Sequence, residues 1–254
     1  MRRLENKVAI VTGGAAGIGA AAAVRMASEG AAVAIGDIDS AGAEALAQRI
    51  NADGGRAIGV HCDIGIEASV KALVERTVAE FGGVDALFAN AANMQAIMQD
   101  EDAVNVALDI FDATIAINLR GQLICTRHVV PELLKRGGGA IIFTSSAASS
   151  VGEATRVSYA MTKSGVEALM RHVANRWGRD GIRANAIAPG FVVTPRMEAQ
   201  MPADMKAQML AGCPSPRLGK PDDIAAMVAL LASADGEWVN GQVLNVNGGV
   251  YKAK

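Results

Sequence analysis

The segment SYAMTK, Ser158 to Lys163, places a tyrosine and a lysine four positions apart in a stretch with helical periodicity. On a helix, residues i and i+4 share a face, with Cβ atoms about 5–6 Å apart. An ammonium group at that distance favours the phenolate, so it should lower the pKa of Tyr159 and suit it to proton transfer near neutral pH. The alternative is a surface lysine beside a half-buried tyrosine, since long helices contain such pairs by chance.

A second candidate site is the glycine-rich segment VTGGAAGIGAA (11–21), which follows an apolar run and opens a helical pattern. Gly13, Gly17 and Gly19 allow a tight turn and the close approach of a pyrophosphate to a helix N-terminus. No GK[ST] is present, so the segment is not a P-loop for ATP. Many strand–helix turns need glycine for backbone reasons alone, but the position in the first βαβ unit favours a dinucleotide.

Asp37 ends the second apolar run, 18 residues after Gly19. A carboxylate in this place can accept hydrogen bonds from the adenosine ribose of a dinucleotide. Its charge would repel the 2′-phosphate of NADP, and neither the loop alanines nor Ile38 offers a compensating cation. The sequence therefore favours NAD as cofactor. Asp37 could instead be a plain turn residue at the start of DIDS, a role that Asp39 could also fill.

Short apolar runs alternate with helical patterns along the whole chain. Runs that are apolar on both faces suit buried parallel strands, and strict alternation predicts a parallel sheet covered by helices on both faces. The expected strands are 7–12, 31–37, 56–62, 84–90, 140–145, 182–188 and 241–247. The expected helices are 17–29, 41–52, 67–81, 108–135, 158–178 and 221–233. We predict a single α/β domain, 1–254, with a doubly wound seven-stranded sheet.

Several residues are typical helix starts. Asp39 or Ser40 could cap the second expected helix and Ser158 the fifth. Pro221 fits the first turn of the last one.

Two connections, 91–107 and 189–220, exceed the usual loop length and follow strands, so we expect both at the edge where open α/β sheets bind ligands. Methionines recur every four residues in the second connection, at Met197, Met201, Met205 and Met209. We expect them to pack in the core. The alternative is a mobile lid over 191–212 that adapts to an apolar substrate, because thioethers repack easily. Met94, Ile97 and Met98 would then form an opposite apolar wall.

Composition and charge restrict the class of protein. Of the 254 residues, 51% are hydrophobic and 20% are charged, which is typical of a globular protein with a large core. The net charge is −2, and no basic stretch indicates a nucleic acid or an anionic membrane as partner. No apolar run approaches the ~18–20 residues of a membrane span. Three widely spaced cysteines without a CxxC predict a cytoplasmic protein, and three histidines without ligand spacing predict no metal site.

The order of these motifs resembles the short-chain dehydrogenase/reductase family along essentially the whole chain. The shared motifs are TGGAAGIG (12–19), Asn118 in AINLRG, Ser146 and YAMTK, with NAIAPGFVVT and VNGG further on. The resemblance implies a single-domain Rossmann fold and four catalytic residues. Tyr159 would be the general acid or base, and Ser146 would hydrogen-bond the same substrate oxygen. Lys163 would lower the pKa of Tyr159 and hold the nicotinamide ribose, and Asn118 would position a water that connects Lys163 to solvent.

Ser145 is a rival for the role of Ser146. Neighbouring side chains of a strand point to opposite faces, so only one of the two should face the site. The family spacing selects Ser146, and the hydroxyl of Ser145 would be satisfied by backbone.

The resemblance also implies a set of residues around the cofactor. They are Gly13, Gly17, Ile18, Gly19, Asp37, Ile38, Asp63, Ile64, Asn90, Ala91, Tyr159, Lys163, Pro189, Gly190, Val192 and Thr194. Asp63 and Ile64 resemble the adenine-edge pair of the family. Ala92 replaces a common family glycine, which puts the local backbone in doubt. Thr194 could also be a simple turn residue before Pro195.

These observations predict hydride transfer between NAD(H) and an apolar secondary alcohol or ketone, a class that includes cyclic and steroid-like compounds. The expected substrate contacts are Ser146, Ala148, Met94 and Met197. One alternative is a 3-oxoacyl-thioester (acyl carrier protein) reductase, which would normally use NADP and is disfavoured by Asp37. Another is a non-catalytic nucleotide-binding scaffold, which would not need all four catalytic residues.

We also expect self-association as a homotetramer or dimer. The helical patterns 108–135 and 158–178 carry more apolar residues than one sheet needs: Ile115, Leu119, Leu123 and Val130 on the first, Val166, Leu169, Met170 and Val173 on the second. The family resemblance points to these two helices as a two-fold interface, and to the last strand and C-terminus as another. The alternative is that these side chains pack only on their own sheet.

Overall fold

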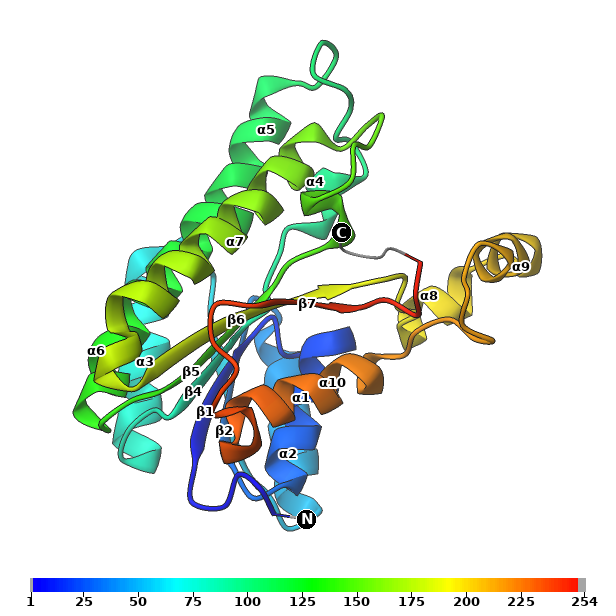
Figure 1. Cartoon of the computed structure of the whole chain (residues 1–254). Helices are drawn as coiled ribbons and strands as arrows, with labels where there is room; N and C mark the ends of the chain where they lie inside the picture. The colour runs from blue at the N-terminus through cyan, green and yellow to red at the C-terminus, as the bar shows by residue number, and fades with distance from the viewer. Residues whose placement is uncertain (1, 251–254) are drawn as a thin grey trace.

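The computed structural model describes residues 2–250 and contains one seven-stranded parallel sheet (Figure 1). Its strands are β1 (Val8–Thr12), β2 (Ala32–Asp37), β3 (Arg56–His61), β4 (Ala86–Ala89), β5 (Gly139–Thr144), β6 (Ile182–Pro189) and β7 (Val243–Val246). The strand order is β3-β2-β1-β4-β5-β6-β7, so the order reverses between β1 and β4. A ligand crevice is expected at such a reversal, beyond the carboxyl ends of the strands.

Helices cover both faces of the sheet (Figure 1). On one face lie α1 (Gly17–Ser28), α2 (Ser40–Ala52) and α10 (Pro221–Ala232). On the other lie α3 (Glu67–Phe81), α6 (Gln122–Lys135) and α7 (Val157–Trp177), with α5 (Leu108–Ile115) leading into α6. Short 3-10 turns lie at η2 (Ala147–Ser149), η3 (Gly178–Asp180) and η4 (Ala234–Gly236). The predicted doubly wound fold is confirmed.

Two apolar cores lie on the two faces of the sheet, because successive side chains of a strand point to opposite faces. Val11 and Ile35 belong to the core beneath α1, α2 and α10. Ile10 and Leu87 belong to the core beneath α3, α6 and α7. Within the described residues, no helix combines the length and apolar character needed to cross a membrane.

The predicted helix 108–135 is interrupted by a π-helix, η1 (Ala116–Gly121), between α5 and α6. One extra residue per turn widens the backbone locally, and such segments are frequent at functional sites. Neither periodicity nor composition at 116–121 indicates this change, so the uninterrupted helix was the wrong prediction there.

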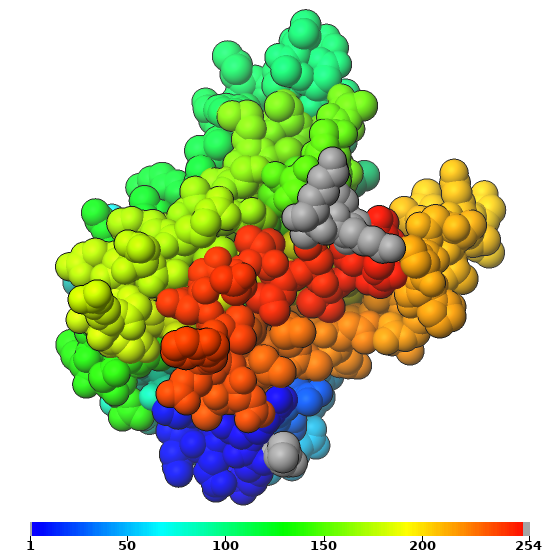
Figure 2. Space-filling view, viewed as in Figure 1, coloured from blue at the N-terminus to red at the C-terminus, as the bar shows by residue number. Residues whose placement is uncertain are grey.

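The two long connections contain helices of their own. The first holds α4 (Met94–Ile97), and the second holds α8 (Pro195–Gln200) and α9 (Ala203–Ala211). Pro202 occupies the N-cap position of α9, and α8 ends before it, as a proline predicts. No residue of α8 or α9 is buried, and the two helices project from the body of the protein (Figure 2). Core packing of the four methionines was therefore a wrong prediction.

Candidate active site

The glycine loop joins β1 to α1 at the point where the strand order reverses. Gly13 has a φ of +64°, and a Cβ there would lie 2.7 Å from the Cα of Ala91 at the end of β4. A Cβ at Gly19 would lie 2.0 Å from the carbonyl oxygen of Gly13. Both positions therefore require glycine. Helix α1 begins without a side-chain cap and without an acidic residue in its first turn, which leaves its amide dipoles to a ligand anion.

Asp37 lies beside this loop. Its Oδ2 accepts from the backbone N–H of Ala15 at 2.9 Å, and its Oδ1 accepts from that of Asp39 at 3.0 Å. Asp39 is the residue that caps α2, through a hydrogen bond from the N–H of Gly42 at 2.9 Å. The two aspartates thus have separate roles, and Ile38 between them is 69% exposed.

The residues present fit a bound dinucleotide. An uncapped helix start with glycines at its entrance suits a pyrophosphate, and a carboxylate one strand away suits a ribose hydroxyl pair. No arginine or lysine forms an ion pair with Asp37 within residues 2–250.

Asn90 joins the ends of three strands around the loop. Its Nδ2 donates to the carbonyl oxygen of Gly13 at 3.0 Å, and its Oδ1 accepts from the hydroxyl of Thr144 at 3.3 Å. Thr12 Oγ1 in turn accepts from the N–H of Asn90 at 3.1 Å. The next turn, Ala91 and Ala92, is held by Gln122, whose Nε2 donates to the carbonyl oxygen of Ala91 at 2.8 Å. Neither Thr144 nor Gln122 was predicted from the sequence.

The predicted adenine-edge pair divides into one polar and one buried residue. Asp63 Oδ1 accepts from the N–H of Gly65 at 2.8 Å and so shapes its own turn. Ile64 is 3% exposed and packs in the core, where a Cβ at Gly121 would meet it at 2.8 Å. The Ile64 side chain is therefore turned away from solvent, which leaves its backbone for a ligand contact.

The segment after β6 approaches the glycine loop. Pro189 ends that strand, and the N–H of Gly190 donates to the carbonyl oxygen of Val246 at 3.1 Å. Val192 forms a parallel bridge with Gly219. Thr194 makes two contacts. Its hydroxyl caps α8 by accepting from the N–H of Met197 at 3.3 Å, and its methyl group would lie 3.2 Å from a Cβ at Gly17.

Tyr159 and Lys163 lie on α7, and Lys163 reaches the carboxyl end of β5. The Nζ of Lys163 lies 5.5 Å from the centre of the Tyr159 ring and donates to the carbonyl oxygen of Thr144 at 2.7 Å. Lys163 is 2% exposed, and its burial lowers the pKa of its ammonium to about 8. Burial raises the pKa of Tyr159, while its hydrogen bond with Ser146 acts in the opposite direction. The predicted net lowering of the Tyr159 pKa was wrong, because desolvation of the phenolate outweighs the favourable contacts.

Ser146, rather than Ser145, faces Tyr159. Its hydroxyl lowers the pKa of Tyr159 and accepts from the N–H of Ala148 at 3.2 Å. Ser145 is 1% exposed and donates to Glu167 Oε1 at 2.6 Å. The prediction that Ser146 and not Ser145 faces Tyr159 agrees with the structure. The predicted partner of the Ser145 hydroxyl was wrong, because it is a carboxylate and not a backbone group.

Asn118 lies in the π-helix η1 and is completely buried. Its Oδ1 accepts from the N–H of Asn93 at 2.7 Å, while its Nδ2 has no hydrogen-bond partner. A buried donor of this kind is usually satisfied by ordered water. The geometry is therefore compatible with the water-holding role that the resemblance implies.

The N-terminus of α7 is held by Asp100, which sequence analysis did not identify. Asp100 is 5% exposed, and its Oδ1 accepts from the N–H of Ser158 at 3.2 Å and from its hydroxyl at 2.8 Å. Its Oδ2 accepts from the N–H of Tyr159 at 2.8 Å. Ser158 was therefore the wrong prediction for the cap. The true cap comes from 58 residues earlier, and no local pattern could indicate it.

Replacing Asp100 with alanine should destabilise the protein by about 2 kcal/mol, since it removes a helix cap that is also charge-assisted and buried. Asp112→Ala, on the exposed face of α5, should change stability by about 0.5 kcal/mol or less. Urea unfolding of both variants against the parent chain measures the difference. Equal midpoints for all three proteins would contradict the capping role.

The expected substrate contacts lie on different elements and differ in exposure. Met94 opens α4 and is 63% exposed, whereas Ala148 in η2 is 4% exposed. Met197 lies in α8, on the projecting arm. In the part of the chain that the structure describes, no three His, Cys, Asp or Glu side chains gather to form a metal site.

Comparison with known proteins places this geometry in a family. The family model described as Enoyl-(Acyl carrier protein) reductase matches residues 13–251. A probable short-chain type dehydrogenase/reductase of Bradyrhizobium diazoefficiens is 40% identical, with 98% of this chain and 89% of that protein covered. The cis-4-hydroxycyclohexanecarboxylate dehydrogenase of Sinomonas cyclohexanicum is 41% identical, with 96% of each chain covered.

A solved structure is similar over nearly the same length. The 7α-hydroxysteroid dehydrogenase in complex with NADH and 7-oxoglycochenodeoxycholic acid superimposes with a TM-score of 0.90 and is 34% identical, covering 97% of this chain and 95% of that one. Fold, loop and relatives together define an α/β oxidoreductase of alcohols and ketones. The chain belongs to the short-chain dehydrogenase/reductase family, as the order of its motifs indicated.

Proposed function

We propose that the protein is an NAD-dependent dehydrogenase or reductase that acts on apolar secondary alcohols or ketones, with cyclic compounds as the main class. The observation that supports this most directly is the pairing of Tyr159 with Lys163 on α7: the buried Lys163 Nζ lies 5.5 Å from the Tyr159 ring, and the Ser146 hydroxyl lowers the pKa of the same tyrosine. Two similar proteins named above act on ring compounds, one a cyclohexane and one a steroid, which supports the substrate class.

Each polar residue of the site has one task in this proposal. Tyr159 gives a proton to, or takes one from, the substrate oxygen, and Ser146 orients that oxygen by hydrogen bonding. Lys163 holds the nicotinamide ribose, and Asn118 holds the water that links Lys163 to solvent. When bound, the cofactor supplies or accepts the hydride at its nicotinamide ring.

The glycine loop and Asp37 would hold the cofactor. Gly13, Gly17 and Gly19 admit the pyrophosphate to the start of α1. The carboxylate of Asp37 accepts from the adenosine ribose and disfavours a 2′-phosphate. The NADH complex of the similar steroid dehydrogenase supports this choice. The cytoplasmic location expected from the cysteines stays a prediction.

A substrate panel tests the proposal. Cyclohexanols, cyclohexanones, hydroxysteroids and a 3-oxoacyl thioester would be screened by absorbance at the NADH wavelength, with NAD(H) and NADP(H) in parallel. We expect turnover of ring alcohols or ketones with NAD(H). Turnover of the thioester with NADPH alone would favour an acyl-thioester reductase, and NAD binding without any turnover would favour a scaffold.

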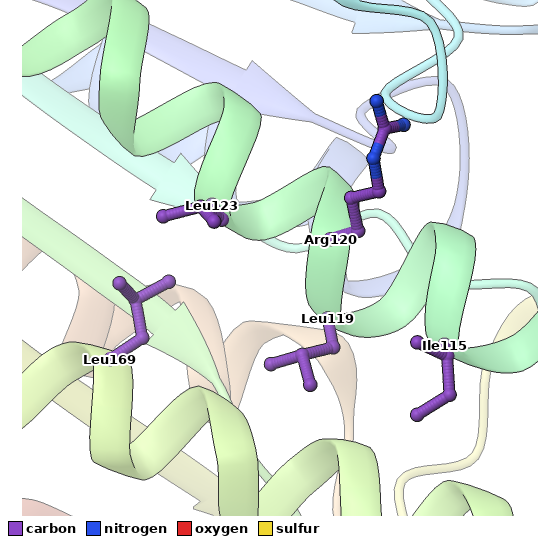
Figure 3. A pocket seen from close by; sticks show the side chains of 5 residues that line it. All are labelled: Ile115, Leu119, Arg120, Leu123 and Leu169. Atoms are coloured by element: carbon purple, nitrogen blue, oxygen red, sulfur yellow. The ribbon is translucent and has the colours of Figure 1, made fainter.

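We also propose that the protein self-associates through an apolar groove between α5, η1, α6 and α7. The groove is lined by Ile115, Leu119, Arg120, Leu123 and Leu169, and the leucines point into the space between the helices (Figure 3). Leu123 is 52% exposed. The remaining members of the predicted interface, Val130, Val166, Met170 and Val173, are buried against their own sheet. For these four residues the alternative prediction, packing on their own sheet and not at a subunit interface, agrees with the structure.

Replacing Leu123 with glutamate should reduce the assembly, because a charge would be buried in an apolar contact. The matched control is Leu134→Glu, on the same helix and 41% exposed but outside the groove lining. Light scattering at micromolar concentration should give a homotetramer or dimer for the parent chain and the control, and a smaller species for Leu123→Glu. A mass near 26.1 kDa for the parent chain would rule the assembly out.

A further inference from the structure

A buried carboxylate lies on the same row of α7 as the tyrosine and the lysine. Residues i, i+4 and i+8 of a helix follow one another along one face. In α7 this row is Tyr159, Lys163 and Glu167. Glu167 is only 8% exposed, and none of the roles proposed above uses it.

Glu167 contacts the turn that carries Ser146 on both sides of that residue. Its Oε1 accepts from the hydroxyl of Ser145 at 2.6 Å and from the hydroxyl of Ser149 at 2.5 Å. The single proton of the Ser149 hydroxyl is shared with the carbonyl oxygen of Ser146, 2.8 Å away. Helix α7 holds the same turn a second time, through Ser164, whose hydroxyl donates to the carbonyl oxygen of Ser149 at 3.0 Å.

We propose that Glu167 is a positioning residue of the active site, which holds the turn that carries Ser146 beside Tyr159 by clamping the hydroxyls of Ser145 and Ser149. The inference rests on the proposed dehydrogenase activity for its kinetic part only. A hydrogen bond to a carboxylate is short and strong, and two of them to one oxygen fix both ends of the turn. The clamp therefore fixes the turn from which the Ser146 hydroxyl projects.

The clamp acts on the ionisation of Tyr159 through Ser146. The Ser146 hydrogen bond lowers the pKa of the phenol against the effect of burial, so release of Ser146 should raise that pKa further. The charged groups near the phenol are Lys163, Arg156 and Glu153. The polar contacts of the Glu167 side chain are with Ser145, Ser149 and Arg171 instead, so we expect these three groups to stay in place when Glu167 is changed.

The chain offers a direct measurement of this ionisation, because it contains only two tyrosines. One is Tyr159 and the other is Tyr251, which lies outside the described residues. In a Tyr251→Phe background, the absorbance of phenolate near 295 nm reports Tyr159 alone. This readout does not require turnover, so it separates the clamp from the proposed function.

The decisive variant is Glu167→Met, which keeps the length of the side chain but removes the acceptor. We expect the titration midpoint of Tyr159 to rise by about 0.5–1 pH unit. We also expect kcat to fall about tenfold, with the KM for NAD unchanged. Glu167→Gln should stay near the parent chain, because both serines donate to Oε1 and an amide oxygen can replace it.

Two controls separate positioning from stability. Arg171→Ala removes the ion-pair partner of Glu167, 3.7 Å away, and should change neither midpoint nor kcat. Ser145→Ala removes one of the two hydrogen bonds of the clamp. It should raise the titration midpoint of Tyr159 and lower kcat, as Glu167→Met does, but by less. The proposal would be overturned if Glu167→Met lowered the melting temperature but left the titration midpoint of Tyr159 within about 0.2 pH units of the parent value. It would also be overturned if the Tyr159 midpoint in Glu167→Gln differed from the parent value as much as in Glu167→Met. A parent chain without turnover would count against the proposed function alone.

Discussion

Tyr159→Phe should lower kcat by about 10²–10⁴-fold, the usual contribution of a positioned acid or base. The substitution keeps the aromatic ring, which lies 5.5 Å from the Lys163 ammonium, and removes only the oxygen that carries the proton. The Kd for NADH, measured by fluorescence titration, should change less than twofold. Ser146→Ala should also lower kcat, because the substrate oxygen then loses its second hydrogen bond.

A measured kcat above a few per cent of the parent value in Tyr159→Phe would remove this residue from the acid–base role. A matched control is Tyr251→Phe, which deletes the other phenol of the chain. We expect that control to keep full activity and full cofactor binding. A loss of NADH binding in Tyr159→Phe would instead indicate a structural role for the hydroxyl.

The second large effect concerns the choice of cofactor. The double variant Asp37→Ala, Ile38→Arg removes the carboxylate beside the glycine loop and adds a partner for a 2′-phosphate. We expect the ratio of kcat/KM for NAD over NADP to fall by about 10²-fold or more, which corresponds to about 2.8 kcal/mol or more. Ile38 is 69% exposed, so an arginine can be placed there without disturbing the core.

The single variants give the controls. Ile38→Arg alone leaves the carboxylate in place and should change the ratio much less than the double variant. Asp39→Ala removes the cap of α2, a hydrogen bond of 2.9 Å to the N–H of Gly42, and should lower stability without changing the cofactor preference. A parent enzyme that already preferred NADP would contradict the assignment of Asp37.

The sequence predicts those residues of the candidate site that lie close together in the chain or at the end of one element. The glycines of the loop, the aspartate after the second strand and the tyrosine–lysine pair each lie within one element or at its end. Their approximate places follow once the strand order is known, because the carboxyl ends of parallel strands meet at one edge. The sign of the Tyr159 pKa shift did not follow, since it depends on how much solvent the fold removes from the phenol.

By itself, the sequence determined the succession of the seven strands and of the helices that cover the sheet, because runs apolar on both faces can only be buried between two helical layers. It also determined the motif residues Asn118, Ser146, Tyr159 and Lys163 and their family. Only the tertiary structure decided which residues hold them. Asp100 caps α7 from 58 positions away and Glu167 clamps the turn of Ser146 from another element. The projecting arm α8–α9 was likewise decided by the fold, since a methionine spacing is the same in a core and on a surface. Contacts between residues far apart in the chain leave no periodic pattern, so burial and hydrogen-bond partners appear only when the chain is folded.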